Sequence, residues 1–230
     1  SATTGDALVR GRHVRKAGSD FSVRDDILNS GTFMEAGPIA LAAMAGHGTV
    51  HVGRWPRVTI VATGDELMPP GADCSPAQIP ASNSPMLHTM LSSMPCESAD
   101  AGIIRDDLSE LESRLRMLTQ TSDIIVTTGG ASVGDHDLVQ TALLNIGADM
   151  DFWKVAMRPG KPIMAGKIDD TIVLGLPGNP SSAYVTAFLF LLPLVRHMAG
   201  ALAPFPELFA APVAIALPAG GSRTEYLRAK

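Results

Sequence analysis

The sequence predicts an α/β protein built on a wound, mostly parallel sheet with helices on both faces, a three-layer arrangement. Two observations lead to this fold class. From Arg57 to about residue 200, short apolar runs typical of buried strands alternate with stretches of helical periodicity. Hydrophobic residues make up 46% of the 230 residues and charged residues 18%, enough apolar material for one sizeable core. Strands that alternate with helices pair in parallel, so we expect ligands at their carboxyl ends.

The elements of this region can be assigned in order along the chain. The predicted strands are residues 57–62, 98–104, 123–128 and 171–176, and the predicted helices are 84–94, 108–118, 138–146 and the segment after Pro180. The second helix has the clearest pattern, because leucines recur from Leu108 at three- and four-residue steps. Asp107 and Glu110 resemble a capping box at its start. Residues 152–157 are predicted to be extended.

The flanking regions differ from this alternating pattern. Residues 1–28 are polar and charged, and residues 29–55 contain an apolar helical stretch (39–44) and a candidate strand (49–52). Residues 199–206 have the composition of a linker, and 207–230 that of the start of a β-rich unit. We therefore predict a central α/β domain at 56–200 with partial flanking domains that contain β structure.

Composition also excludes several classes of protein. The net charge is −5 and there is no basic run, so we do not expect nucleic-acid binding. Cys74 and Cys96 are too few for a disulfide scaffold, and we expect two reduced thiols in a cytoplasmic protein without a signal peptide. The most apolar segment, 183–195, is shorter than a membrane span and is interrupted by Pro193. We therefore expect a buried helix there and no membrane partner.

The most informative stretch is the glycine-rich sequence from Thr127 to Asp137, between a predicted strand and a predicted helix. Such a turn gathers backbone N–H groups and a helix N-terminus at one point, which is an anion-binding geometry. Its glycines allow a ligand to approach the backbone closely. Because Asp135 and Asp137 add negative charge beside this site, the combination indicates a phosphorylated ligand handled together with a divalent cation.

Carboxylates also follow two other predicted strands. Asp65 and Glu66 follow the first, and Asp106 follows the second, where Asp107 is the better helix cap. Together with Asp137 they bring acids from three loops to one sheet edge, where oxygen ligands suit Mg²⁺ that bridges to phosphate. The alternative is that Asp65, Asp106 and Asp137 are turn and cap residues, which is the commoner role of any single Asp at such a junction.

Two further segments offer groups that bind anions. If 152–158 is extended, Lys154 and Arg158 share one face and lie about 13 Å apart, at roughly 3.3 Å per residue. That spacing suits two anionic groups on an extended ligand, and the alternative is a solvated basic face. Asn179 and Pro180 form a helix start that needs no ligand, although its free N–H groups and the Ser181 and Ser182 hydroxyls can also hold a phosphate.

Five of these segments, taken in order, resemble the molybdopterin molybdenumtransferase family, to which the gephyrin E domain belongs. The matching segments are 63–67, 102–107, 129–137, 153–162 and 175–180. The resemblance implies a molybdopterin-binding fold and a transferase that inserts molybdenum from molybdate into adenylylated molybdopterin with release of AMP. It also implies a requirement for Mg²⁺, a cytoplasmic homodimer with a site shared between subunits, and a molybdopterin adenylyltransferase as a further partner.

Carried across by position, the resemblance assigns roles to single residues. The acids that act in catalysis and bind the metal are Glu66, Asp106 and Asp137. The residues that bind the substrate are Lys154, Arg158, Gly129, Gly130, Ser132, Gly134, Asn179, Ser181, Asp20 and Arg223. Asp20 and Arg223 are expected to act on the partner subunit's sheet domain.

The chain also departs from the family pattern. The domain that precedes residue 12 and the end of the C-terminal β domain are missing, as in a fragment of a longer polypeptide, and Ala81 stands where relatives usually carry Asp. Two rival functions therefore remain open. One is a scaffold module that binds a pterin without turnover, and the other is a nucleotide pyrophosphatase or deamidase on the same fold.

Overall fold

The computed structural model describes residues 10–129, 138–217 and 220–227, in two compact units, 1–52 and 53–230. In the described part of the first unit, helix α1 (Ala36–Met44) covers the predicted apolar stretch and confirms it. The strand predicted at 49–52 is wrong, because these residues are exposed and pair with no strand in the described part of the chain. A short β-prone sequence needs such a partner to form a strand.

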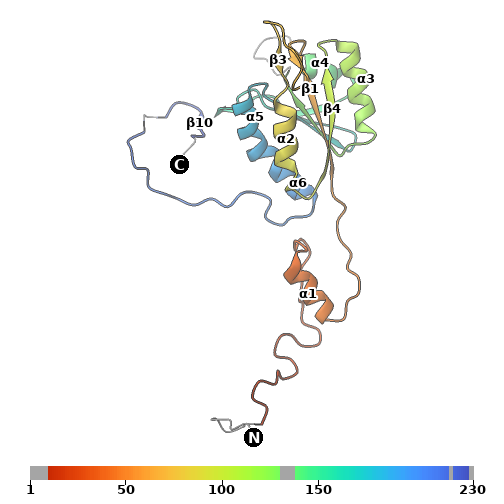
Figure 1. Ribbon diagram of the computed structural model, residues 1–230, viewed down its shortest axis with the longest axis vertical. Coiled ribbons are helices and arrows are strands. Elements are labelled where there is room, and N and C mark those ends of the chain that lie inside the picture. The colour runs from red at the N-terminus through yellow and green to blue at the C-terminus, as the bar shows by residue number, and fades with distance from the viewer. Residues whose placement is uncertain (1–9, 130–137, 218–219, 228–230) are drawn as a thin grey trace. The chain divides into compact units, whose positions relative to one another are not determined.

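The second unit is built on a six-stranded sheet, ordered β4 (Glu97–Ile104), β1 (Arg57–Thr63), β5 (Ile124–Thr128), β9 (Thr171–Leu176), β8 (Met164–Ile168) and β6 (Asp149–Phe152) (Figure 1). The first four strands are parallel, and β8 and β6 each run antiparallel to a neighbour. The mostly parallel wound sheet is therefore confirmed. The antiparallel edge was not predicted from the sequence.

Helices cover both faces of this sheet (Figure 1). On one face lie α2 (Asn83–Leu91), α5 (Pro180–Thr186) and α6 (Leu192–Met198), and buried side chains of α2 and α6 pack with Val58, Ile60 and Val126. On the other face lie α3 (Leu108–Thr119) and α4 (Leu138–Asn145), packed with Val61 and Ile125. Successive side chains of a strand point to opposite faces of the sheet. Each central strand therefore contributes side chains to both cores, and its sequence is a continuous apolar run.

The apolar segment near residue 190 is longer and more continuous than predicted. A five-residue π-helix, η1 (Ala187–Leu191), joins α5 to α6, and Pro193 lies in the first turn of α6 without breaking the helical run. The wider turn accommodates the proline, which has no N–H to donate. The 19 residues Pro180–Met198 meet the length and mean hydropathy, 1.2, of a membrane span. Their inner face packs in the core described above, as predicted for a buried helix.

Two short strand pairs complete the second unit. β2 (Leu67–Met68) pairs with β3 (Ile79–Pro80), and β7 (Met157–Arg158) pairs with β10 (Thr224–Glu225). The continuous extended segment predicted at 152–157 is wrong: the backbone bends at Trp153 and Ala156. The Met157 N–H donates to the Val155 carbonyl only two residues earlier, at 2.8 Å, which is a tight turn. The estimate of about 13 Å between Lys154 and Arg158 assumed a continuous strand and therefore does not apply.

The amino ends of the central strands are held by Asp123, directly before β5. Its carboxylate accepts hydrogen bonds from the Arg54 guanidinium at 2.8 and 2.9 Å, and from the Arg57 backbone N–H at 2.7 Å and side chain at 3.1 and 3.3 Å. These contacts, the Arg54 hydrogen bond first, hold the pKa of Asp123 far below its usual range. Close by, the buried Thr171 hydroxyl donates to the Ser122 carbonyl at 2.9 Å. The sheet is therefore joined at this edge by side chains as well as by its ladder.

Candidate functional site

The order of the parallel strands marks the position of the site. The chain passes from β1 outward to β4 and then returns to place β5 on the other side of β1. At such a switch point the adjoining loops diverge, and a crevice opens at the carboxyl ends of the strands. A cavity of about 310 Å³ lies there, lined by Ala62, Glu66, Leu67, Ile79, Pro80, Ala81, Ser82, Asn83, Thr128, Gly129, Gly178, Asn179 and Pro180.

Two glycines allow the strand ends to meet at this cavity. Gly129, directly after β5, has φ +95°, and a Cβ there would collide with the Thr63 carbonyl oxygen at the end of β1. A Cβ on Gly178 would lie 3.4 Å from the Gly129 Cα. Three strand ends therefore approach one another backbone to backbone, and a ligand in the cavity lies against main-chain atoms.

Acids from two loops form a second feature of the site. Glu66 lines the cavity, and its carboxylate folds back over Gly64, where a Cβ would lie 2.8 Å from the carboxylate carbon. The Asp106 backbone N–H donates to Asp65 Oδ1 at 3.2 Å, which joins the loop after β4 to the loop after β1. Partial burial, together with the charges of Asp65 and Glu66, raises the pKa of Asp106. Negative charge from separate loops is therefore concentrated at this edge.

Of the three acids predicted to bind a metal ion, the structure describes Glu66 and Asp106. Asp137, like Gly130, Ser132 and Gly134, lies outside the described residues. Among the residues that are described, no three His, Cys, Asp or Glu side chains come together in a group that could hold a metal ion. Glu66 and Asp106 are thus two acids of the predicted three, close enough to influence each other's charge.

Sequence reasoning did not identify Asn83. This first residue of α2 is 9% exposed and lines the cavity, where its amide nitrogen donates to Thr128 Oγ1 at 2.7 Å and to the Gly178 carbonyl at 2.8 Å. In the sequence it follows Ser82 and resembles part of a helix cap. One signal did exist: Asn83, Leu87 and Leu91 recur at four-residue steps, so Asn83 continues the buried face of the helix.

Buried polar atoms without partners gather at this edge of the sheet. Asn83 Oδ1, Thr63 Oγ1 and Thr127 Oγ1 are buried and find no hydrogen-bond partner in the part of the chain that the structure describes. The two threonines lie at or near the ends of β1 and β5. Each such group carries a desolvation cost, and since only Asn83 of the three lines the cavity, its Oδ1 is the atom whose cost a ligand there relieves.

The predicted basic residues lie elsewhere. Lys154 and Arg158 are exposed, and neither is among the residues that line the cavity. Arg158 Nη1 lies 3.6 Å from Glu225 Oε1, across the β7–β10 pair, and Arg223 directly precedes β10. Asp20 belongs to the first unit, where it forms an ion pair with Arg15 at 2.7 Å.

The remaining predicted groups surround the start of α5. Asn179 caps this helix by accepting from the Ser182 N–H at 3.2 Å, and it also lines the cavity. Ser181 is exposed and does not line it. Ala81 is buried in the cavity wall, and its N–H donates to the Met68 carbonyl at 2.8 Å.

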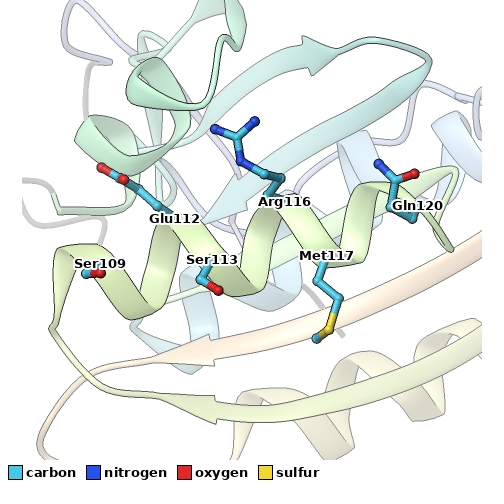
Figure 2. Close-up of a pocket in the computed structure, with 6 residues that line it drawn as sticks. All are labelled: Ser109, Glu112, Ser113, Arg116, Met117 and Gln120. Carbon is cyan, nitrogen blue, oxygen red and sulfur yellow. The ribbon is translucent and has the colours of Figure 1, made fainter.

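A second hollow, of about 630 Å³, lies on the solvent side of α3. All six residues that line it belong to this one helix and its C-cap, among them Glu112, Arg116 and Met117 (Figure 2). Glu112 accepts a hydrogen bond from Asn145 at 2.6 Å, so its carboxylate already has a partner. Among the described residues, no strand end or glycine turn lines this hollow, so it lacks the features found at the switch-point cavity.

Matches to known proteins cover the sheet domain as a whole. Residues 59–197 match a family model described as "Probable molybdopterin binding domain". The chain is 33% identical over 189 residues to a molybdopterin molybdenumtransferase of Haemophilus influenzae, which covers 82% of this chain and 46% of that protein. It is 32% identical over 224 residues to one of Staphylococcus aureus, covering 96% and 53%.

A solved structure agrees with these sequence matches. The molybdopterin biosynthesis MoeA protein from Pyrococcus horikosii superposes with a TM-score of 0.65 at 29% identity, over 75% of this chain and 43% of that one. The chain spans about half the length of the curated relatives it matches.

Proposed function

The chain belongs to the family of probable molybdopterin binding domains, and from this premise we propose that it is the substrate-binding α/β region of a molybdopterin molybdenumtransferase. In this role it binds adenylylated molybdopterin and takes part in the insertion of molybdenum from molybdate, with release of AMP. The names of the relatives support this activity. The observation that carries it is the cavity at the switch point, which Glu66 lines together with the glycine of the β5 turn, while Asp106 joins the loop after β4 to the loop after β1.

Backbone groups of the site suit the phosphate part of this substrate. Gly129 brings main chain to the cavity wall, and Asn179, the N-cap of α5, lines the cavity beside the positive end of the helix dipole. Both features favour oxygens with negative charge. We assign no protein nucleophile, because displacement at the pyrophosphate assisted by a metal ion does not require a covalent protein intermediate.

Mg²⁺ is the cofactor that we propose for this site. The carboxylates of Asp65, Glu66 and Asp106 are hard oxygen ligands, and the raised pKa of Asp106 reflects burial together with negative charge that a divalent cation offsets. Glu66 and Asp106 would hold the ion, with Asp137 as the third ligand. When bound, Mg²⁺ supplies positive charge that stabilises the pyrophosphate as its bond is broken.

Residues outside the cavity are assigned to more distant parts of the substrates. Lys154 and Arg158 are exposed cations that attract the anionic pterin substrate or molybdate. We further propose that the protein is a cytoplasmic homodimer in which Asp20 and Arg223 serve the partner's site, and that it receives its substrate from a molybdopterin adenylyltransferase.

The proposed activity is tested by AMP release from adenylylated molybdopterin, with the complete polypeptide that contains this chain. Release should depend on both Mg²⁺ and molybdate, and Asp106→Ala and Asp137→Ala should each reduce it at least a hundredfold. Asp151→Ala, an exposed acid on the edge strand β6, is the matched control and should leave the rate unchanged.

The outcomes separate the rival functions. Tight pterin binding with no AMP release favours the scaffold, for which Ala81 in the cavity wall is the supporting observation. Hydrolysis of ordinary dinucleotides without any effect of molybdate favours a pyrophosphatase. Equal rates in the Asp106 and Asp151 variants contradict our assignment of the acids.

A further inference from the structure

Asn83 is a buried amide in the wall of the switch-point cavity, and it joins three elements. From the first turn of α2 its Nδ2 reaches Thr128 Oγ1, at the end of β5, at 2.7 Å and the Gly178 carbonyl, after β9, at 2.8 Å. Since all three residues line the cavity, Asn83 belongs to the cavity wall.

The hydrogen bonds fix which way the amide faces. The Gly178 carbonyl can only accept, so the group that faces it must be the nitrogen and not the oxygen. Nδ2 has two hydrogens, and both are used by the two contacts above. The other polar atom of the amide, Oδ1, is buried and has no hydrogen-bond partner among the described residues. The residue as a whole is 9% exposed.

An amide oxygen in this position selects one kind of ligand atom. It can accept a hydrogen bond but cannot donate one, and Glu66 adds a second acceptor to the same cavity. Phosphate oxygens are also acceptors, so they form no hydrogen bond with Asn83 Oδ1 or with the Glu66 carboxylate. A ligand group that carries N–H hydrogens satisfies it.

We propose that Asn83 is a substrate-specificity residue, whose Oδ1 accepts a hydrogen bond from an N–H of the ligand's heterocycle. This inference rests on the proposed function and extends it, because a pterin carries such donors in its 2-amino group and ring N–H. The cavity then divides by chemistry. The backbone at Gly129 and the start of α5 meets phosphate, and Asn83 meets the ring.

The test compares two small probes with the wild-type chain by calorimetric titration. Pterin has the N–H donors, whereas 1,3-dimethyllumazine is a pteridine of similar size without them. Wild type should bind pterin roughly tenfold more tightly, the effect of one buried hydrogen bond. Equal affinity for the two probes overturns the proposal without any variant.

The variant Asn83→Ala assigns the preference to this residue. It should bind both probes with equal, weak affinity, while its affinity for AMP changes less than twofold. If all three ligands weaken together, Asn83 acts only through packing and the proposal is wrong. Asn83→Ser, which is smaller and polar, replaces the alanine variant if that does not fold, with the same loss of preference expected.

Asn83 Oδ1 could have either of two roles, as an acceptor for an N–H of the ring or as a ligand of a metal ion. Titrations with and without Mg²⁺ distinguish the two. If the pterin preference of the wild type vanishes in EDTA and returns with Mg²⁺, the amide oxygen is a metal ligand and the inference fails. If wild type releases AMP from the proposed substrate but shows no preference for pterin, the inference fails and the proposed function stands. If wild type binds neither pteridine, the proposed function is the part that fails.

Discussion

The two ends of the central sheet use their polar groups in opposite ways. At the amino end, Asp123 accepts hydrogen bonds from two arginines, and the buried Thr171 hydroxyl donates to Ser122. At the carboxyl end, Thr63, Thr127 and Asn83 keep buried oxygens without partners in the described part of the chain. Both ends belong to the same strands, so secondary structure does not explain the difference.

The contrast indicates that the amino end of the sheet stabilises the domain and supports our proposal that the carboxyl end binds the ligand. Satisfied polar groups at the amino end stabilise the pairing of neighbouring strands. Unsatisfied oxygens and neighbouring acids at the carboxyl end cost stability in the absence of ligand, as is common at functional sites. Substitutions at the two ends should therefore change stability in opposite directions.

The largest expected effect comes from breaking the cluster at the amino end. Asp123→Ala removes the shared acceptor of Arg54, Arg57 and the Arg57 backbone N–H, and it should lower the free energy of unfolding by about 3 kcal/mol, because several hydrogen bonds to a charged and largely buried group are lost. Urea denaturation measures this change. Asp170→Ala, which removes an exposed ion pair with Lys167, is the control and should have no measurable effect. Equal losses in both variants would contradict a special role for Asp123.

The same residue predicts a dependence of stability on pH. The pKa of Asp123 is lowered in the folded chain, chiefly by the Arg54 hydrogen bond. Its stabilising contribution is therefore complete above the unfolded pKa, about 3.9, and is lost as the pH falls through the lower folded value. Between pH 6 and pH 2 the wild type should lose about 2 kcal/mol more than Asp123→Asn. Parallel urea titrations of the two proteins would refute this if their stabilities fell equally.

A pair of threonines sharpens the comparison between the two ends. Thr171→Val removes a hydroxyl that donates to Ser122 and should cost about 1 kcal/mol. Thr127→Val removes a buried hydroxyl that has no partner among the described residues and should stabilise by up to about 1 kcal/mol. The two variants make the same chemical change, so each is the control for the other. Shifts of the same sign in thermal unfolding would argue against the contrast.

The sequence predicted the parts of the fold that depend on local signals. Leucine spacing placed α3, and its cap was correct, since Asp107 accepts from the Glu110 N–H at 2.7 Å. Strand β8, which pairs with β9 and β6, was missed because Gly166 and Lys167 break any alternating apolar pattern. The strand predicted at 49–52 had a suitable composition but pairs with no strand among the described residues, and strand pairing is decided only by tertiary structure.

The site was less predictable, since its chemistry depends on which groups remain unpaired. Acids after parallel strands could be assigned to one edge, and Asp65 and Asp106 do meet there. Asn83 could not be recognised as an unpaired acceptor, because its partners, Thr128 and Gly178, lie 45 and 95 residues away. Lys154 and Arg158 were placed on a continuous strand that the bends at Trp153 and Ala156 prevent.

The smallest expected change in stability concerns a single residue of the carboxyl end, where stability and function should oppose each other. Asp106→Asn removes one charge beside Asp65 and Glu66; burial, together with repulsion from these two acids, raises the pKa of Asp106. Without Mg²⁺ the variant should unfold at a slightly higher urea concentration than the wild type, because like charges no longer meet. AMP release by the complete polypeptide should nevertheless fall at least a hundredfold. A variant that is less stable and fully active would show that Asp106 serves the fold, as the acid at the amino end does, and not the ligand.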